Sequence, residues 1–595
     1  MPSIVTLFFR KVSTLSRKMG PARTIRFLAS WLAVTLEYWV WQLRHEPGLA
    51  ELNEQRNAVF PAMPRISIVV PLYNTPARFL KALVASVRRQ TYANWQLCLL
   101  DGGSTAPHMT PLIARLASGD SRITVQRLAE NRGIAGNTNA AIALATGTWV
   151  ALLDHDDLLT PWALYEVVQQ IHATPQAEFI YSDEDKVGPD GRLRFSPHFK
   201  SDYFPDTFRS GNYICHFAVI KRTLGEAVGW FRPGFDGAQD HELFLRLTEA
   251  TANIVHIPKI LYHWRISPLS TAGFSDSKPH AYEAGRRAIQ EHLQRTGRNG
   301  TVVAHPEHPG IYQVMYGLPP GTLVSIIIPT HDRADLLAPC VDSIVSRTAH
   351  EQYEIIIIDH NSQDAATVRL LDDYRTRPNV TVISWRKSFN WSAMNNAAAR
   401  VARGRLLCFL NNDTRIISPD WLERMGEFAL QPDVGAVGAK LFSTDDRIQH
   451  AGISVGGQFV AVPVHPGAHA ADTGYVGRLV CIQNVQAVTG ACLMVEKETF
   501  WQAGGFDETL SVAYNDVSFC LTLNAAGKRT VFTPYAQLYH DESASRGQDT
   551  TPEKMQRLLR EREILLARWP GLETASDPCW NRNLRHRQAP RPAIR

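Results

Sequence analysis

The sequence lacks several patterns that would assign a function at once. Its 8 cysteines in 595 residues are scattered without CxxC pairs, which argues against a zinc site or a disulfide framework. Cys98 and Cys408 fall in apolar, strand-like runs and are expected to be reduced core thiols. The net charge of +5 comes without a long basic run interleaved with aromatic residues, so nucleic acid is not expected as a partner. No GxGxxG follows the first predicted strand, which disfavours a dehydrogenase.

Acidic residues are missing from the first 36 residues, which carry six basic ones: Arg10, Lys11, Arg17, Lys18, Arg23 and Arg26. No cleavable signal peptide is expected there. An apolar run from Phe27 to Leu43 is interrupted by Glu37. As a helix it would be about 26 Å long, short of the roughly 30 Å hydrocarbon core of a bilayer. We expect a helix on an anionic membrane surface or one packed against the first domain, and least of all a transmembrane span.

The chain contains the same unit twice. ISIVVPLYN begins at Ile66 and VSIIIPTHD at Val324, 258 residues later. Three further motifs and a histidine recur in the same order, in the pairs Asp101 and Asp359, Asp156 and Asp413, Asp240 and Asp516, and His263 and His540. A repeat of this length indicates duplicated domains, because solenoid repeats are only about 20–50 residues long.

Each copy predicts an α/β fold. Short β-branched runs alternate with helical stretches, which is typical of a parallel, doubly wound sheet with ligands at the carboxyl ends of the strands. The acidic loops all lie at that edge, so they can converge on one crevice. We predict five segments: a basic, amphipathic helical segment (1–60), a first domain (61–300), a linker (301–321), a second domain (322–550) and a helical, basic tail (551–595).

The acidic cluster Asp154, Asp156 and Asp157 in LLDHDD predicts a site for a divalent cation. Carboxylate oxygens are the ligands that Mg²⁺ and Mn²⁺ prefer. Such an ion would bridge a substrate diphosphate and neutralise charge as the diphosphate leaves. Acidic residues at strand ends also serve as turn formers and helix caps, so the recurrence as LNND in the second copy, ending at Asp413, strengthens the metal interpretation.

The other repeated polar residues each have a functional and a structural interpretation. Asp101 and Asp359 end the second strand of each copy, where a carboxylate accepts hydrogen bonds from a nucleoside or forms a turn. Asn74 and Asp332 would line the same pocket. Asp240 and Asp516 precede amphipathic helices and suit either an N-cap or a general base for an acceptor hydroxyl.

The histidines keep a constant distance from these carboxylates. His263 follows Asp240 by 23 residues, and His540 follows Asp516 by 24. A lone histidine of this kind is commonly a core residue, whereas a pair at the same distance is better explained as a metal or phosphate ligand.

The motifs VVPLYN, LLDGGS, LLDHDD, GAQDHE and LYHWR, with IIIPTHD, IIDHNS, LNND, VTGACLMV, GGFDE, YNDVSF and YHDESASRG, resemble those of the family 2 glycosyltransferases with the GT-A fold. The resemblance covers roughly residues 64–275 and 322–548. The tandem arrangement is similar to that of bacterial enzymes that build O-antigen and other surface polysaccharides.

The resemblance implies two tandem GT-A domains, preceded by a helical segment, that perform inverting, metal-dependent sugar transfer. It implies UDP-, dTDP- or GDP-sugar donors, a lipid-linked or polysaccharide acceptor, Mg²⁺ or Mn²⁺, and a place in the cytoplasm at the inner face of the membrane. The implied catalytic bases are Asp240 and Asp516. The implied nucleotide-sugar ligands are Pro71, Asn74, Asp101, Asp154, Pro329, Asp332 and Asp359, and the implied metal ligands are Asp156, Asp157, His263, Asp413 and His540.

The second copy departs from the family pattern. Asn411 and Asn412 leave Asp413 as the single carboxylate of its cluster, and Ser518 and Thr522 stand where relatives usually have Asp and Arg. The first copy has His241 where Tyr is usual. One domain could therefore be a pseudo-enzyme that binds the glycan or donor while the other transfers. A sugar nucleotidyltransferase is disfavoured because PLYN and PTHD replace a Gly-rich, Arg-bearing phosphate loop, and a scaffold would not need the repeated polar residues.

Overall fold

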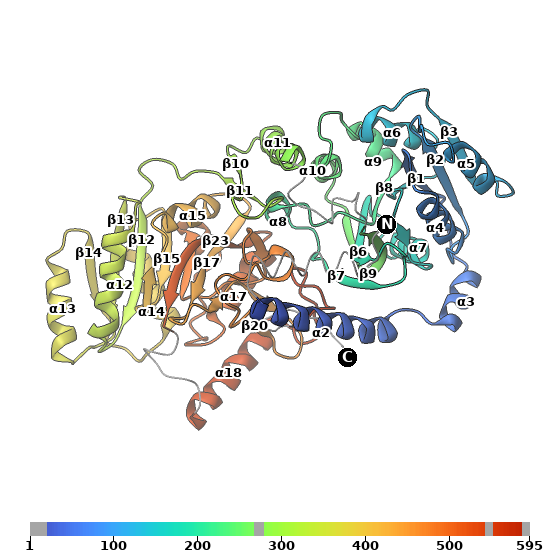
Figure 1. Ribbon diagram of the computed structural model, residues 1–595. Coiled ribbons are helices and arrows are strands. Elements are labelled where there is room, and N and C mark those ends of the chain that lie inside the picture. The colour runs from blue at the N-terminus through green and yellow to red at the C-terminus, as the bar shows by residue number, and fades with distance from the viewer. Residues whose placement is uncertain (1–20, 267–278, 542–550, 586–595) are drawn as a thin grey trace.

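The computed structural model describes residues 21–266, 279–541 and 551–585, without the side chains of 21–31. Two large sheets lie at opposite ends of an elongated molecule, and the helices α8, α10 and α11 lie between them (Figure 1). The helices of the first half are α2 (Pro21–His45), α3 (Leu49–Asn57), α4 (Ala77–Arg88), α5 (Met109–Ala117), α6 (Gly133–Ile142), α7 (Ala163–Ala173), α8 (Pro205–Ser210), α9 (Arg222–Val228), α10 (Gln239–Ala250) and α11 (Pro279–Arg295).

The first sheet has the strand order β3-β2-β1-β4-β8-β6-β9-β5, with β7 paired to β6. Its strands are β1 (Ile66–Leu72), β2 (Trp95–Asp101), β3 (Ile123–Arg127), β4 (Trp149–Leu152), β5 (Leu158–Leu159), β6 (Phe179–Val187), β7 (Arg194–His198), β8 (Ala218–Lys221) and β9 (Ile254–Arg265). β1 to β4 are parallel, whereas β8 is antiparallel to both β4 and β6.

The second sheet repeats this topology, in the order β14-β13-β12-β15-β22-β17-β23-β16. Its main strands are β12 (Val324–Thr330), β13 (Tyr353–Asp359), β14 (Val380–Ser384), β15 (Leu406–Leu410), β16 (Thr414–Ile416), β17 (Val434–Phe442), β22 (Cys492–Glu496) and β23 (Arg529–His540). Shorter strands are β18 (Ile448–His450), β19 (Ile453–Val455), β20 (Ala461–Pro463) and β21 (Gln483–Val485). The helices are α12 (Ala334–Arg347), α13 (Ala365–Arg375), α14 (Trp391–Val401), α15 (Trp421–Ala429), α16 (Lys497–Gln502), α17 (Asn515–Ala525), α18 (Pro552–Arg568) and the 3₁₀ turn η2 (Tyr475–Gly477).

The predicted architecture of two tandem α/β domains behind a helical segment is confirmed, with one difference in the sheets. Both are mixed rather than wholly parallel, because β8 and β22 insert antiparallel beside β4 and β15. The remaining pattern follows the sequence closely. Every residue of β1 and β2 is buried, as expected for central strands with helices on both faces.

The segment predicted as a linker, 301–321, contains a hairpin of β10 (Thr301–Ala304) and β11 (Tyr312–Met315). It lies between the two sheets in Figure 1. Val302, Tyr312 and Val314 are buried in an apolar cluster with α11 and other parts of the first domain. The connection is therefore packed onto the first domain over this stretch.

The two domains are joined by direct contacts. Arg529 of β23 donates to Asp206 of α8 and to Asp433, and Arg298 pairs with the same Asp433. Asn484 of β21 accepts from the backbone N–H groups of Asp206 and Thr207. These bonds fix α8 of the first domain against β21 and β23 of the second.

The two ends of the described chain also pack across the domains. Tyr38 and Trp41 of α2 belong to one buried apolar cluster with Phe199 of the first domain and Trp580 near the C-terminus. Asn581 donates to both carboxylate oxygens of Asp183 on β6. In the described part of the chain, no helix has the length and apolar character needed to cross a membrane.

Candidate active sites

The loops after the first two strands have the same construction in both halves. Asp101 Oδ1 accepts a hydrogen bond from Ser104 N at 2.9 Å, and Asp359 Oδ1 accepts one from Ser362 N at 2.9 Å. Ser104 Oγ in turn accepts from the backbone N of Asn74, as Ser362 Oγ does from Asp332. The predicted turn-forming role of these carboxylates is therefore present in both copies.

Asn74 and Asp332 close these loops from the other side. Asn74 Oδ1 accepts from Thr105 N and Ala106 N, both at 2.9 Å. Asp332 Oδ1 accepts from the N–H groups of the two matching residues, at 2.6 and 2.7 Å. Both have positive φ, 49° and 46°, a conformation that Asn and Asp adopt more readily than other non-glycine residues. Their side chains therefore hold the loops that follow the first two strands of each sheet.

Asp101 retains one oxygen for another partner. Its Oδ2 is buried and accepts no hydrogen bond from the described residues, although Arg127 Nε lies 3.6 Å away. Arg127 is half exposed, so it remains accessible to solvent or to a ligand. An unfilled acceptor at the carboxyl end of β2 fits a donor group of a nucleoside.

Three side chains in the first half come close enough to share a cation. The ligand atoms of Asp154, Asp157 and His216 all lie within 4.8 Å of one another. Asp154 is exposed, whereas Asp157 is buried. Asp157 also accepts hydrogen bonds from Tyr262 Oη at 2.6 Å and from Arg265 N at 2.6 Å. Two carboxylates and one imidazole form a donor set that suits Mn²⁺ or Mg²⁺.

The charged side chains of this cluster and its neighbours shift one another's pKa values. Burial lowers the pKa of His216, but Asp154 and Glu184 outweigh that effect and hold it well above its usual range. Burial, together with the negative charge of Asp156, raises the pKa of Asp157 well above its usual range. A cation placed here would relieve the repulsion between the carboxylates, because an opposite charge favours the ionised forms. It would also displace the proton of His216, because an imidazole must be neutral to bind a metal.

The cluster differs in membership from the predicted metal ligands. Asp154 and Asp157 belong to the acidic cluster that the sequence predicts as a cation site, although the resemblance also implies a nucleotide-sugar role for Asp154, and His216 was not predicted. Asp156 lies in the same turn but outside this group, and His263 Nδ1 donates to Asp185 Oδ1 at 2.6 Å. Comparing the two copies could not have revealed His216, because strand pairing places Ala491 at the corresponding position of the second half.

The two candidate bases lie at the start of equivalent helices. Asp240 begins α10 and accepts from its neighbour His241 N at 2.8 Å and from Asn212 Nδ2 at 2.9 Å. Asp516 begins α17 and accepts from Val517 N and Gly490 N, both at 2.8 Å. Each carboxylate is thus held by its own helix and by the segment that precedes β8 or β22.

Desolvation raises the pKa of both carboxylates. At Asp240 the positive charge of His216 partly offsets the rise, and the negative charge of Asp154 adds to it. At Asp516 hydrogen bonds from backbone N–H groups oppose the rise. A carboxylate with a raised pKa is a stronger proton acceptor once it is ionised. Asn212 links this base to the cation cluster, because it donates to Asp240 and accepts from the N–H of Cys215, the residue before His216.

The second half has a cavity of about 520 Å³ at the carboxyl ends of its strands. Four of the predicted site residues line it: Pro329, Asp413, Asp516 and His540. Asp413 Oδ1 lies 3.3 Å from His540 Nε2. The sequence placed these residues together from motifs up to 211 positions apart, and the structure brings them to one cavity. Asp332 and Asp359 do not line the cavity, but they hold the loops whose residues His331 and His360 do.

Comparisons with known proteins agree with this arrangement. The chain matches the model of glycosyl transferase family 2 over residues 67–229 and again over 325–456. It is 44% identical over 529 residues to an uncharacterized protein of Sinorhizobium fredii, covering 88% of this chain and 58% of that protein. It is 38% identical over 518 residues to the O-antigen biosynthesis protein RfbC of Myxococcus xanthus, covering 87% of this chain and 40% of RfbC. The chain thus spans about half the length of these relatives.

Among solved structures, a mannosyltransferase of Pyrobaculum calidifontis in complex with GDP-Man and Mn²⁺ is 15% identical, with a TM-score of 0.32, over 51% of this chain and 76% of that one. The two matched regions each contain the first strands and the acidic loops described above. The chain therefore belongs to glycosyl transferase family 2, with one family domain in each half.

Proposed function

We propose that the first domain transfers a sugar from a nucleotide-diphosphate donor to an acceptor hydroxyl with inversion at the anomeric carbon. The observation that carries this proposal is the position of Asp240, whose carboxylate is held by Asn212, four residues before His216 of the cation cluster. The acceptor oxygen forms a bond to the anomeric carbon as the bond from that carbon to the diphosphate oxygen breaks. The proton of the hydroxyl passes to Asp240, and the bonding electrons leave with the diphosphate.

The other residues of the first domain bind and orient the donor. Asp154, Asp157 and His216 would hold Mg²⁺ or Mn²⁺, which supplies positive charge to the departing diphosphate. Asp101 offers its free oxygen to the nucleoside of a UDP-, dTDP- or GDP-sugar, and Pro71 and Asn74 shape the adjacent loop. Asn212 holds the carboxylate of Asp240, which accepts the proton of the attacking hydroxyl.

In the second domain, Asp516 would act as the base, and Asp413 and His540 would bind the metal or diphosphate in the shared cavity. A binding role without transfer is the second candidate. Among the described residues of the second domain, no three His, Cys, Asp or Glu side chains lie close enough together to hold a cation, as Asp154, Asp157 and His216 do in the first domain. Ala491 replaces His216, and Asn411 and Thr414 stand at the positions of Asp154 and Asp157. The cavity supports donor or glycan binding in either case.

The acceptor is proposed to be a lipid-linked or growing surface polysaccharide, in line with the similarity to an O-antigen biosynthesis protein. Helix α2 supports a place at the inner face of a membrane. Five of its apolar side chains form one exposed stripe: Leu32, Leu36, Trp39, Val40 and Leu43, between 38% and 86% exposed. The preceding residues supply basic groups for anionic lipids.

Donor turnover with an acceptor panel tests the transfer proposal. Asp240→Asn and Asp516→Asn are compared with wild type, and Asp236→Asn, an exposed acidic residue four positions before Asp240, serves as the matched control. Loss of a general base is expected to lower kcat by about 10²–10⁴-fold. Full activity of Asp240→Asn would contradict the assignment, and an unchanged rate in Asp516→Asn would favour the binding role of the second domain.

Metal dependence is tested separately by direct binding. Mn²⁺ titration followed by electron paramagnetic resonance reports free ion without requiring turnover. His216→Ala, which introduces the residue that the second half has at this position, is expected to weaken Mn²⁺ binding by at least about tenfold. Full transfer activity in the presence of EDTA would contradict a metal-dependent reaction.

A further inference from the structure

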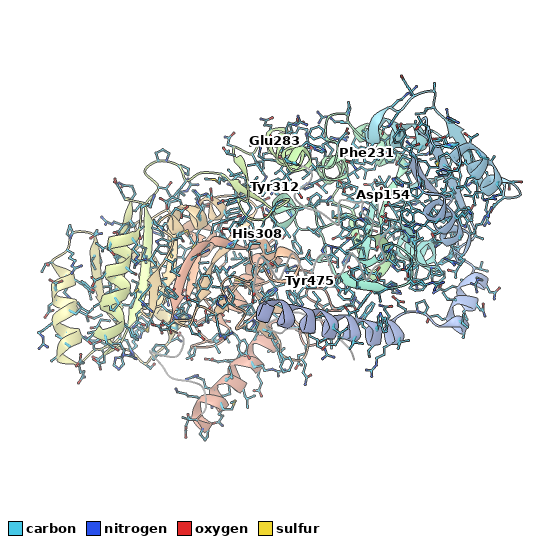
Figure 2. All side chains as sticks on the ribbon, in the orientation of Figure 1. Asp154, Phe231, Glu283, His308, Tyr312 and Tyr475 are labelled. Carbon is cyan, nitrogen blue, oxygen red and sulfur yellow. The ribbon has the colours of Figure 1, made fainter. Side chains whose placement is uncertain are left out.

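A second cavity, of about 210 Å³, lies between the two domains. Its walls come from three parts of the chain: residues 198–213 around α8, residues 309–311 of the hairpin, and residues 475–483 of the second domain. Figure 2 shows Tyr475 and Tyr312 in the middle of the molecule, with Asp154 on the side of the first sheet. Neither domain alone would form this cavity.

Hydrogen bonds across the interface hold its walls in place. Tyr475 donates to Pro197 O at 2.7 Å and accepts from Phe199 N at 2.9 Å. On the other side, Asn484 N donates to Thr207 Oγ1 at 2.8 Å. The space is therefore bounded by fixed groups, which is what a preformed binding site requires.

The lining offers both aromatic rings and polar groups. Tyr213 and Tyr475 contribute rings, and Asn212 and Gln483 contribute side-chain amides. Gln483 is 3% exposed, and its Oε1 accepts no hydrogen bond from the described residues. Its Nε2 is already committed to Cys481 Sγ and Ile482 O. A buried acceptor left without a donor is costly, so this oxygen is suited to a ligand that carries a hydroxyl or N–H group.

The cavity is linked to the first active site through Asn212. This residue lines the cavity and donates to Asp240 Oδ2 at 2.9 Å. Its Oδ1 accepts from Cys215 N, and the next residue, His216, belongs to the cation cluster. One short segment therefore joins the interdomain cavity, the candidate base and the cation cluster.

We propose that the interdomain cavity binds a sugar unit of the acceptor and presents it to the first active site. The proposal rests on the function proposed above and names the acceptor as a hydroxyl-rich glycan. Gln483 accepts a hydrogen bond from a sugar hydroxyl, and Tyr213 and Tyr475 pack against the ring. The second domain thus contributes residues to acceptor recognition by the first.

Two variants of the second domain test the proposal in an Asp516→Asn background, which leaves the first base as the only active one. Gln483→Leu removes the acceptor oxygen at similar volume. Val476→Trp places a bulky ring at an exposed position of the cavity wall. The matched controls are Gln486→Leu, three residues along the same segment and outside the cavity, and Val476→Asn, which tolerates the local φ of 51°.

Binding is measured by saturation-transfer NMR with octyl glycosides of glucose, galactose and N-acetylglucosamine, which requires no turnover. At least one glycoside is expected to bind the parent and both controls, and to bind Gln483→Leu and Val476→Trp at least tenfold more weakly. The acceptor KM for transfer should rise by the same factor, while the Kd of the nucleotide-sugar donor stays unchanged.

The outcomes separate this proposal from the proposed function. Absence of glycoside binding to the parent, or equal binding by all variants, overturns the cavity assignment even if transfer occurs. Absence of transfer by a parent that binds glycoside through Gln483 refutes the transfer function and leaves the cavity as a glycan site. Val476→Trp is a surface substitution and is expected to fold. Loss of glycoside binding by this variant can therefore be attributed to the blocked cavity and not to unfolding.

Discussion

At the residue scale, the repeated motifs predicted where the polar side chains lie in the fold better than they predicted which groups these side chains contact. Asp101, Asp359, Asn74 and Asp332 all lie at the expected strand ends, and each uses an oxygen to hold its own loop. The sequence had left the turn-forming and ligand-binding interpretations open. The structure shows that the two are compatible at Asp101, because a carboxylate has two oxygens and its second one has no hydrogen-bond donor among the described residues.

His216 and Asn212 show what the motifs could not predict. Both lie in the segment GNYICHF, which has no counterpart of similar sequence in the second half. They reach the site because the antiparallel β8 starts next to β4, which carries the acidic turn. Strand pairing, and not spacing along the chain, sets this contact. The amino-acid sequence therefore contains no repeated spacing from which the contact could be predicted.

The raised pKa of Asp240 predicts opposite effects of pH on activity and stability. The base must be ionised, so kcat/KM should fall with decreasing pH, at values above the ordinary aspartate pKa of about 3.9. A carboxyl group whose pKa is raised by folding stabilises the protein below its unfolded pKa, and that contribution is lost as pH rises through the folded pKa. Asp240→Asn, in which the group cannot ionise, should therefore raise Tm by a few degrees near pH 8.

A pH–rate profile in the Asp516→Asn background, with thermal unfolding of wild type and Asp240→Asn at pH 5 and 8, checks both effects. The gain in Tm should be smaller at pH 5, where the wild-type carboxyl group is closer to its neutral form. An equal change in Tm at both pH values would show that ionisation of Asp240 has no energetic cost in the fold.

At the element scale, α2 combines two of the expectations from sequence. Tyr38 and Trp41 pack into the protein, and Tyr38 donates to Asp185 at 2.5 Å. The apolar stripe on the remaining surface of the helix is exposed. Hydrophobic residues on more than one face of a helix explain why the pattern alone could not decide between packing and surface attachment.

Replacing Leu36 and Trp39 by Ser should weaken binding to a membrane while leaving the fold intact. Full burial of one such side chain contributes about 1.5–3 kcal/mol, so the double variant should bind vesicles at least tenfold more weakly. Cosedimentation with vesicles of phosphatidylglycerol and phosphatidylethanolamine measures this.

The matched control for α2 is Val59→Ser, an exposed apolar residue beyond the helices. It should bind vesicles as wild type does. Equal binding by the α2 double variant and wild type would refute attachment through this stripe, and unchanged near-UV circular dichroism would confirm that the inner face of α2 remains packed.

At the scale of the whole molecule, duplication explains the equivalent sheets but not their mutual placement. The repeat predicted two domains from motif order alone. The bonds that join them, such as Arg529 to Asp206, connect residues 323 positions apart that belong to no repeated motif. A sequence with two similar halves therefore predicts each half more readily than the interface, which depends on single pairings of side chains.

The ion-pair network at this interface should couple the unfolding of the two domains. Asp206 is almost fully buried, and Arg529 and Arg209 hold its pKa below the usual range. Arg529 and Arg298 likewise hold the pKa of Asp433 below its usual range. Carboxylates of this kind stabilise the fold above their unfolded pKa, and the stabilisation is lost as pH falls through the lower folded pKa.

Arg529→Met should remove the shared partner of both carboxylates at similar side-chain length. Breaking a buried ion pair costs about 3–5 kcal/mol, and the lower end applies here because Arg529 is partly exposed and Asp206 keeps Arg209. We expect urea unfolding at pH 7 to change from one transition to two, as the domains lose their coupling. Arg405→Met, which removes an exposed pair with Glu496, should leave a single transition. A single, unshifted transition in Arg529→Met would show that the ion pairs of Arg529 do not couple the unfolding of the two domains.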